Sequence, residues 1–109
     1  EMMRIKVAQN NDCFTWRKLR YPSVMDKGLT EDKIKELENY EVSEMLTRRE
    51  KLALKFADKM GIEHQSIDDK FFALLHEEFS DAEIAEMSIV ISVCIGWGRL
   101  LSVFKAEEA

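Results

Sequence analysis

The stretch SDAEIAEMSIVISVCIGWGRLLSVF, from Ser80 to Phe104, decides the fold. Ser80 and Glu83 have the spacing of a capping box, in which each side chain accepts a hydrogen bond from the backbone N–H of the other residue. The box opens the longest apolar run of the chain, from Ile84 to Phe104, which we interpret as the central helix. Because this run is apolar on nearly all sides, we expect neighbours all round it, from its own chain or from a second subunit.

A membrane span is the competing interpretation of this run. Small, polar and charged residues interrupt it: Glu86, Ser88, Ser92, Gly96, Gly98 and Arg99. Because a span needs about 20 predominantly apolar residues and charges are costly inside it, we expect no membrane partner. If this helix is buried, Arg99 needs an acidic or carbonyl partner, and Glu86 lies too far along the helix to provide it. The partner is then elsewhere, in this chain or across a subunit interface.

Two more helices are predicted in the middle of the chain. Thr47 and Glu50 form another capping-box pattern, ahead of a helix that we expect to reach Met60 and to stop at Gly61. Its inner stripe is Ala53, Phe56, Ala57 and Met60. An amphipathic helix over residues 67–79 follows, with Phe71, Phe72, Leu74 and Leu75 available for burial.

The N-terminal part predicts a helix, a turn and a second helix. The first helix covers residues 1–9, with Met2, Ile5 and Ala8 spaced along one face. The turn consists of Asn10, Asn11 and Asp12. Asp12 is placed to cap the second helix, over residues 13–20, which Pro22 should kink or end.

A short helix is expected between this region and the middle of the chain. Gly28 is a candidate for the residue that closes the segment before it. Thr30 is the predicted N-cap of an acidic helix that runs to about Glu38. All predicted elements are therefore helical.

Length and composition favour a single all-α domain spanning residues 1–109. A chain of 109 residues can form one core, and one Pro and four Gly leave few places to turn. The net charge of -5 is spread along the chain, which argues against a nucleic-acid partner. No segment has the pattern of a signal peptide.

The cysteine and histidine residues set further expectations. Cys13 and Cys94 are too few for a disulfide framework, so we expect a reducing, cytoplasmic compartment. Cys94 lies within the apolar run and is predicted to be a core residue. His64 and His76 have no ligand-type residues at metal-site spacing, so both are expected at the surface, with no metal and no cofactor.

Three segments together resemble the alkylhydroperoxidase-like (carboxymuconolactone decarboxylase) superfamily. They are EMMRIKVAQ at residues 1–9 with Cys13, LTRREKLALKFAD at residues 46–58, and FSDAEIAEM at residues 79–87 followed by GWGRL at residues 96–100. The resemblance covers almost the whole chain and implies the family's multi-helical fold, without its N-terminal part. It also implies a homo-oligomer, which in this family is commonly a dimer, trimer or hexamer.

The resemblance also implies a site. Redox members of the family carry Cys-x-x-Cys-x-x-x-His at a helix start, and a Glu on the preceding helix completes a proton relay. In this sequence Glu1 matches the relay Glu and Cys13 the first cysteine, whereas Trp16 and Arg20 occupy the second cysteine and histidine positions. Cys13 therefore cannot form the vicinal disulfide of a dithiol mechanism.

The remaining residues of this segment still favour a reactive thiol. Cys13, Trp16, Arg17 and Arg20 are spaced to share one helix face. The helix dipole and the guanidinium groups both favour thiolate over thiol. Arg20 is a candidate for binding an anionic substrate, and Trp16 for filling the space of the lost thiol. The alternative role of Cys13 is a small, partly buried apolar residue.

Two classes of function are compatible with this pattern. In the first, Cys13 alone attacks a peroxide and an external thiol resolves the sulfenic acid, as in an antioxidant oxidoreductase. In the second, the chain is a non-redox member of the same fold. It is then either a decarboxylase-like enzyme, with Glu1 and more weakly Tyr21 as acid or base, or an inactive binding or scaffolding oligomer.

Overall fold

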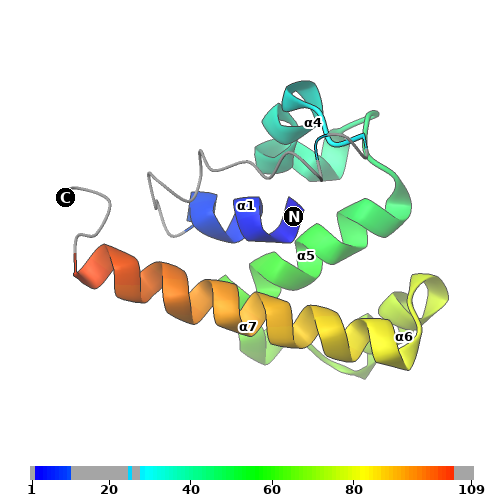
Figure 1. Cartoon of the computed structure of the whole chain (residues 1–109). Coiled ribbons are helices and arrows are strands. Elements are labelled where there is room, and N and C mark those ends of the chain that lie inside the picture. The colour runs from blue at the N-terminus through cyan, green and yellow to red at the C-terminus, as the bar shows by residue number, and fades with distance from the viewer. Residues whose placement is uncertain (1, 11–24, 26–27, 105–109) are drawn as a thin grey trace.

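The structure is a computed structural model that describes residues 2–10, 25 and 28–104, and it contains no strand among them. The α-helices are α1 (Met2–Asn10), α4 (Glu31–Lys35), α5 (Arg48–Ile62), α6 (Asp69–Glu78) and α7 (Asp81–Val103). Two short 3-10 helices, η1 (Leu37–Val42) and η2 (His64–Ser66), join them (Figure 1). The predicted all-α fold class is confirmed.

The predicted caps are present with hydrogen bonds. The backbone N–H of Glu50 donates to the Thr47 hydroxyl at 3.1 Å, and the N–H of Thr47 donates to the Glu50 carboxylate at 2.9 Å. Ser80 and Glu83 make the same pair of bonds at 3.2 and 2.9 Å. Thr30 caps α4 by accepting from the N–H of Lys33 at 3.2 Å. Such caps each stabilise a helix by roughly 1 kcal/mol, so they fix where α5 and α7 begin.

Several predicted helix ends differ from the observed ones. Gly61 does not stop α5, which continues to Ile62 because the N–H of Glu63 still bonds to the carbonyl of Lys59. The predicted helix up to Glu38 is α4 followed by a turn of 3-10 helix. The helix predicted over residues 67–79 begins at Asp69, because the Asp68 carboxylate caps it. Gly28 has a φ of +106°, as expected of a residue that closes a segment.

Helix α1 lies at the centre of the molecule and not at its surface. Figure 1 shows it between α4 and α7, with α5 alongside. Five consecutive residues, Arg4 to Ala8, are buried. Ile5 and Ala8 of the predicted face are buried and Met2 is half-buried, but the burial extends beyond this face because α1 is enclosed from several sides. Hydrophobic spacing cannot reveal such burial when Arg4 and Lys6 belong to it.

Two hydrophobic clusters meet across α1 and α5. The larger contains Val7, Leu52, Phe56, Ala57, Phe71, Leu75, Phe79, Ile84, Met87, Ile91 and Cys94. The smaller contains Ile5, Leu29, Ile34, Leu37, Tyr40, Leu46 and Leu54. Val7 and Ile5 thus project from one helix into different clusters. In α6, Phe71 and Leu75 are buried as predicted, whereas Phe72 and Leu74 are about two-fifths exposed.

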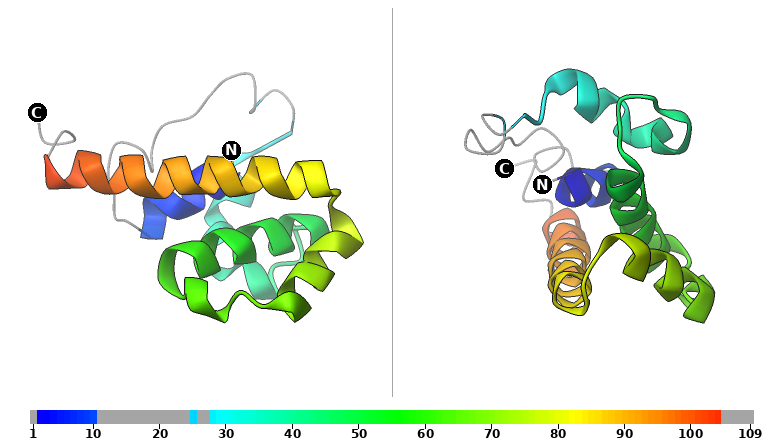
Figure 2. Two further views of the ribbon diagram at one scale, coloured as in Figure 1. Left: turned by 90° about the horizontal axis from the view of Figure 1, so that it is seen from below. Right: turned by 90° about the vertical axis from the view of Figure 1, so that its right-hand side faces the viewer.

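Helix α7 is as long as predicted, but among the described residues it packs through one face only. Its buried residues are Ile84, Met87, Ile91, Cys94 and Gly98, which recur every three or four positions. Figure 2 shows why: α1 and α5 lie on the same side of α7. The expectation of neighbours all round is therefore not met by the described part of this chain. By length and composition alone, α7 could also cross a membrane. An 18-residue stretch of this helix has a mean hydropathy of 1.6, and 28% of that stretch is buried.

Candidate functional site

The residues predicted for the thiol site lie outside the described residues. They are Glu1, Cys13, Trp16, Arg17, Arg20 and Tyr21. The same holds for the turn at Asn11 and Asp12, the helix over residues 13–20, and Pro22. Their arrangement stays a prediction, but the structure does describe Asn10, from which this segment continues.

Asn10 belongs to a polar cluster where α1 meets α5. Its side-chain amide donates to the Asp58 carboxylate at 2.7 Å, and its amide oxygen accepts from the Lys6 ammonium at 3.2 Å. Lys6 and Asp58 also form an ion pair at 3.5 Å, in which the Lys6 side chain is 9% exposed. The buried ammonium is thus balanced by a carboxylate and an amide oxygen, as a buried charge requires.

Tyr40 borders the same cluster from η1. The Lys6 ammonium lies 5.8 Å from the centre of its ring. Burial of the phenol raises the pKa of Tyr40 above its ordinary value, and the carboxylates of Asp58 and Glu41 raise it further. Tyr40 is therefore a neutral hydrogen-bonding group at physiological pH and not a base.

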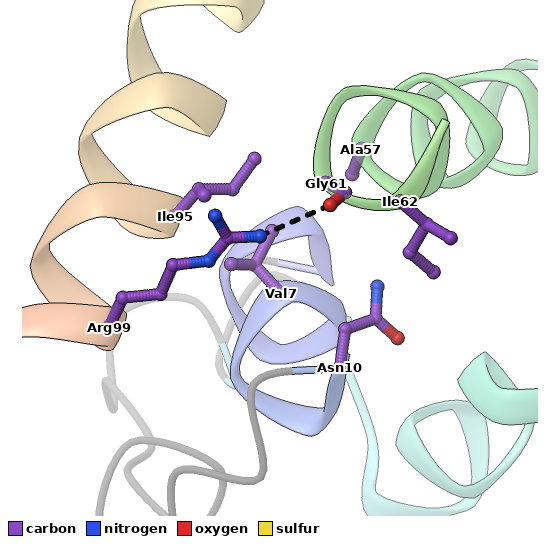
Figure 3. A pocket seen from close by; sticks show the side chains of 7 residues that line it. All are labelled: Val7, Asn10, Ala57, Gly61, Ile62, Ile95 and Arg99. Atoms are coloured by element: carbon purple, nitrogen blue, oxygen red, sulfur yellow. Dashed lines mark hydrogen bonds between the residues drawn. The ribbon is translucent and has the colours of Figure 1, made fainter. Parts of the chain in front are cut away.

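Asn10 also lines a pocket of about 240 Å³, which lies between α1, α5 and α7 (Figure 3). The described lining residues of the pocket are Val7, Asn10, Ala57, Gly61, Ile62, Ile95 and Arg99. Most of them are apolar, and the polar groups come from Asn10 and Arg99. Mostly apolar walls with a few polar groups are typical of small-molecule sites.

Arg99 reaches across this pocket. Its guanidinium donates to the carbonyl oxygen of Gly61 at 3.1 Å, the bond drawn in Figure 3. The prediction that Glu86 is not its partner is confirmed, and the partner is a carbonyl of this chain. A guanidinium is permanently charged and cannot act as an acid or base near neutrality, so Arg99 can bind an anion or a carbonyl but cannot move a proton.

A second hollow, of about 320 Å³, lies near the start of α7. Arg49 lines it, stacks over the Phe79 ring at 4.2 Å and pairs with the Glu83 carboxylate. Arg48 next to it bonds to Glu77 at 2.6 Å and to Glu78 at 3.0 Å. These arginines are occupied by partners that tie α5 to α6 and α7, so this region serves the structure.

The remaining predicted residues fall where the sequence places them. His64 and His76 are exposed, and Cys94 is buried in the larger hydrophobic cluster. Over residues 2–10, 25 and 28–104, no group of three His, Cys, Asp or Glu side chains could hold a metal ion.

Sequence reasoning did not find the cluster of Lys6, Asp58 and Tyr40. Lys6 and Asn10 are four residues apart and so share a helix face, which is the one local signal. Asp58 is 48 residues beyond Asn10, and only the packing of α5 on α1 brings the two together.

The comparisons with known proteins give relatives without a described activity. No family model matches the chain. Two uncharacterized proteins of Mycobacterium tuberculosis, one from strain CDC 1551 / Oshkosh and one from strain ATCC 25618 / H37Rv, are similar to it. Each is 30% identical over 93 residues, which is 84% of this chain and 32% of the relative. The chain therefore spans about a third of the length of the curated relatives it matches.

Proposed function

We propose that the chain is a member of the alkylhydroperoxidase-like (carboxymuconolactone decarboxylase) superfamily and acts as a one-cysteine, thiol-dependent peroxidase. The observation that supports this is the pocket at the end of α1. Asn10, the last residue of α1, lines the pocket, and Cys13 follows it by three residues. The pocket has apolar walls for an organic peroxide, and the second thiol of a dithiol mechanism is replaced by Trp16.

The proposed reaction needs one thiolate and two external thiols. The Cys13 thiolate attacks an oxygen of the hydroperoxide, so that an S–O bond forms while the O–O bond breaks. The alcohol leaves after taking a proton, and Cys13 becomes a sulfenic acid. A low-molecular-weight thiol then forms a mixed disulfide with Cys13 and releases water. A second such thiol releases the Cys13 thiol and a small disulfide. This reductant fits the reducing, cytoplasmic setting that the two cysteines lead us to propose.

A second candidate function is a non-redox member of the fold. The observation that favours it is the chemistry of the described pocket residues. Asn10 is neutral and Arg99 is permanently cationic, so these two residues can bind a small anionic ligand but cannot transfer its protons. In this case the chain is a binding or scaffolding oligomer, or a decarboxylase-like enzyme whose acid or base is Glu1.

The experiment that tests the first function is the rate of Cys13 alkylation against pH, in a Cys94→Ala background. Consumption of hydrogen peroxide and of an organic hydroperoxide is followed in parallel, with a thiol reductant present. A thiolate pKa below about 8.5, with turnover that Cys13→Ser abolishes, supports the peroxidase. An unreactive thiol at neutral pH, or equal peroxide consumption by Cys13→Ser, rules it out.

The second function is tested by thermal shift with small carboxylates. A ligand present at 100 times its dissociation constant stabilises the folded state by roughly 2.7 kcal/mol. Stabilisation that disappears in Arg99→Gln supports ligand binding in this pocket. An equal shift in wild type and Arg99→Gln places the binding elsewhere and contradicts it.

A further inference from the structure

The outer face of α7 carries a continuous apolar stripe. It consists of Ile89, Val90, Val93, Trp97, Leu100, Val103 and the following Phe104, and their exposed fractions run from 40% to 74%. They point away from the buried face of Ile91 and Cys94. No charged residue occurs between Glu86 and Arg99, and Arg99 is turned toward Gly61. Contiguous apolar surface of this kind marks an interaction site.

The spacing of the stripe is that of a helix-pairing seam. Residues 89, 93, 96, 100 and 103 are separated alternately by four and three positions, which is the 3.5-residue repeat of paired helices. The single gap in this seam is Gly96, which has no side chain. A Cβ atom built at Gly96 would meet nothing within 4 Å, so the gap faces open space.

The apolar stripe is also self-complementary when two copies of α7 are placed antiparallel. When two copies lie antiparallel about the point between Gly96 and Trp97, Val93 faces Leu100 of the other copy. In the same way Ile89 faces Phe104, and Val90 faces Val103. Trp97, the largest side chain of the stripe, then faces Gly96, where there is space for its ring. A twofold interface requires this relation, in which residue i contacts j and j contacts i.

We propose that α7 pairs with α7 of a second copy, antiparallel about a twofold axis beside Gly96 and Trp97, with each Trp97 ring packed on the other chain's Gly96. The exposed stripe offers on the order of 700 Å² of apolar surface per copy, and a stable interface needs roughly 800 Å² from each partner. This pairing supplies neighbours for the outer face, against which the described part of the chain packs nothing. It does not depend on the peroxidase function.

A bilayer fits the same helix less well. Ile91 and Cys94 on its inner face are buried in the larger core cluster, which a spanning helix would have to leave. A surface-bound helix would favour basic flanks, whereas the first turn of α7 carries Asp81 and Glu83.

The first measurement is the mass in solution, by sedimentation velocity and light scattering from 1 to 100 μM. The expected species is a dimer, of twice 12.7 kDa. A monomer at 100 μM, or a species larger than a dimer, overturns the proposal. So does a chain that is monomeric in buffer and floats with vesicles of phosphatidylcholine and phosphatidylglycerol.

The decisive variant is Gly96→Leu, because it separates pairing from folding. The Cβ atom of the new side chain meets nothing within 4 Å in its own chain, and Leu is a better helix former than Gly. We therefore expect unchanged helicity and unchanged or higher thermal stability of the monomer. The dimer dissociation constant should rise at least tenfold, because the Leu side chain occupies the space in which the Trp97 ring of the other copy packs. A dimer as tight as the wild type contradicts the proposed contact.

Charge exchange tests the antiparallel register. Val93→Glu and Leu100→Lys should each give monomers, and the double variant should recover the dimer, because every Glu then faces a Lys of the other copy. Ala73→Glu, on the exposed side of α6, is the matched control and should remain dimeric. A double variant as monomeric as the single ones overturns the register.

Discussion

Arg99 donates a hydrogen bond to the carbonyl oxygen of Gly61, with 3.1 Å between its Nη2 atom and that oxygen. The carbonyl groups in the last turn of α5 lack helical partners and carry the negative end of the helix dipole, so a cation there is favourable. This bond also closes one side of the pocket.

Arg99→Ala is therefore expected to lower the free energy of unfolding by about 1 kcal/mol, the usual net value of such a bond. Chemical denaturation monitored by circular dichroism measures the loss. Arg99→Lys is the control and should recover part of it, because an ammonium retains the charge at the helix end. Stability equal to wild type in Arg99→Ala would show that the contact contributes nothing.

A substitution at Leu54 tests how α5 packs in the core. Leu54 is fully buried in the smaller cluster, although it lies outside the stripe predicted for α5. Leu54→Ala should cost 2 to 5 kcal/mol by the loss of buried surface and the cavity that remains. Lys55→Ala, its exposed neighbour on the same helix, should change stability by less than about 0.5 kcal/mol. Similar losses in the two variants would contradict the packing of α5 between two clusters.

The sequence predicts where helices start better than which faces they bury. Ser80, Thr47 and Thr30 act as caps as predicted, because capping is a local interaction within three residues. Burial of Leu54 and of α1 depends on a second cluster, formed by residues distant in the chain. A single amphipathic stripe per helix assumes one core, and α1 and α5 each face two.

The candidate site could be predicted in part. The need of Arg99 for a partner follows from its place in an apolar helix, and the structure supplies the carbonyl of Gly61. The link between Asn10 and Asp58 spans 48 residues, and no local pattern encodes it. The roles of Glu1, Cys13, Trp16, Arg17, Arg20 and Tyr21 stay predictions.

Asp58 is expected to be important for stability through Lys6. The Lys6 side chain is buried, and Asp58 lies 3.5 Å from its ammonium. Asp58→Ala leaves the ammonium with Asn10 as its described hydrogen-bond partner, so we expect a loss of about 2 to 3 kcal/mol. Urea denaturation at pH 7 measures it.

The matched control keeps the cluster free of an unpaired charge. In Lys6→Met with Asp58→Ala, no buried ammonium remains, and replacing such a pair by apolar groups is often close to neutral. The double variant should therefore be more stable than Asp58→Ala alone. If the double variant is the less stable of the two, the cost does not come from the unpaired Lys6.

The lowered pKa of the Glu83 carboxyl predicts how the stability of the fold depends on pH. The backbone N–H of Ser80 and then the Arg49 guanidinium hold the pKa of the Glu83 carboxyl below its usual range. A folded-state pKa below the unfolded value of about 4.3 means that the unfolded chain binds the proton more readily between the two values. The contribution of Glu83 is then fully present above the unfolded pKa and is lost as the pH falls through the folded pKa. Thermal unfolding of wild type and Glu83→Gln from pH 7 to pH 2.5 should give a lower midpoint for the variant at pH 7 and a difference that shrinks in acid. Parallel curves over this range would show that the charge of Glu83 does not hold the start of α7.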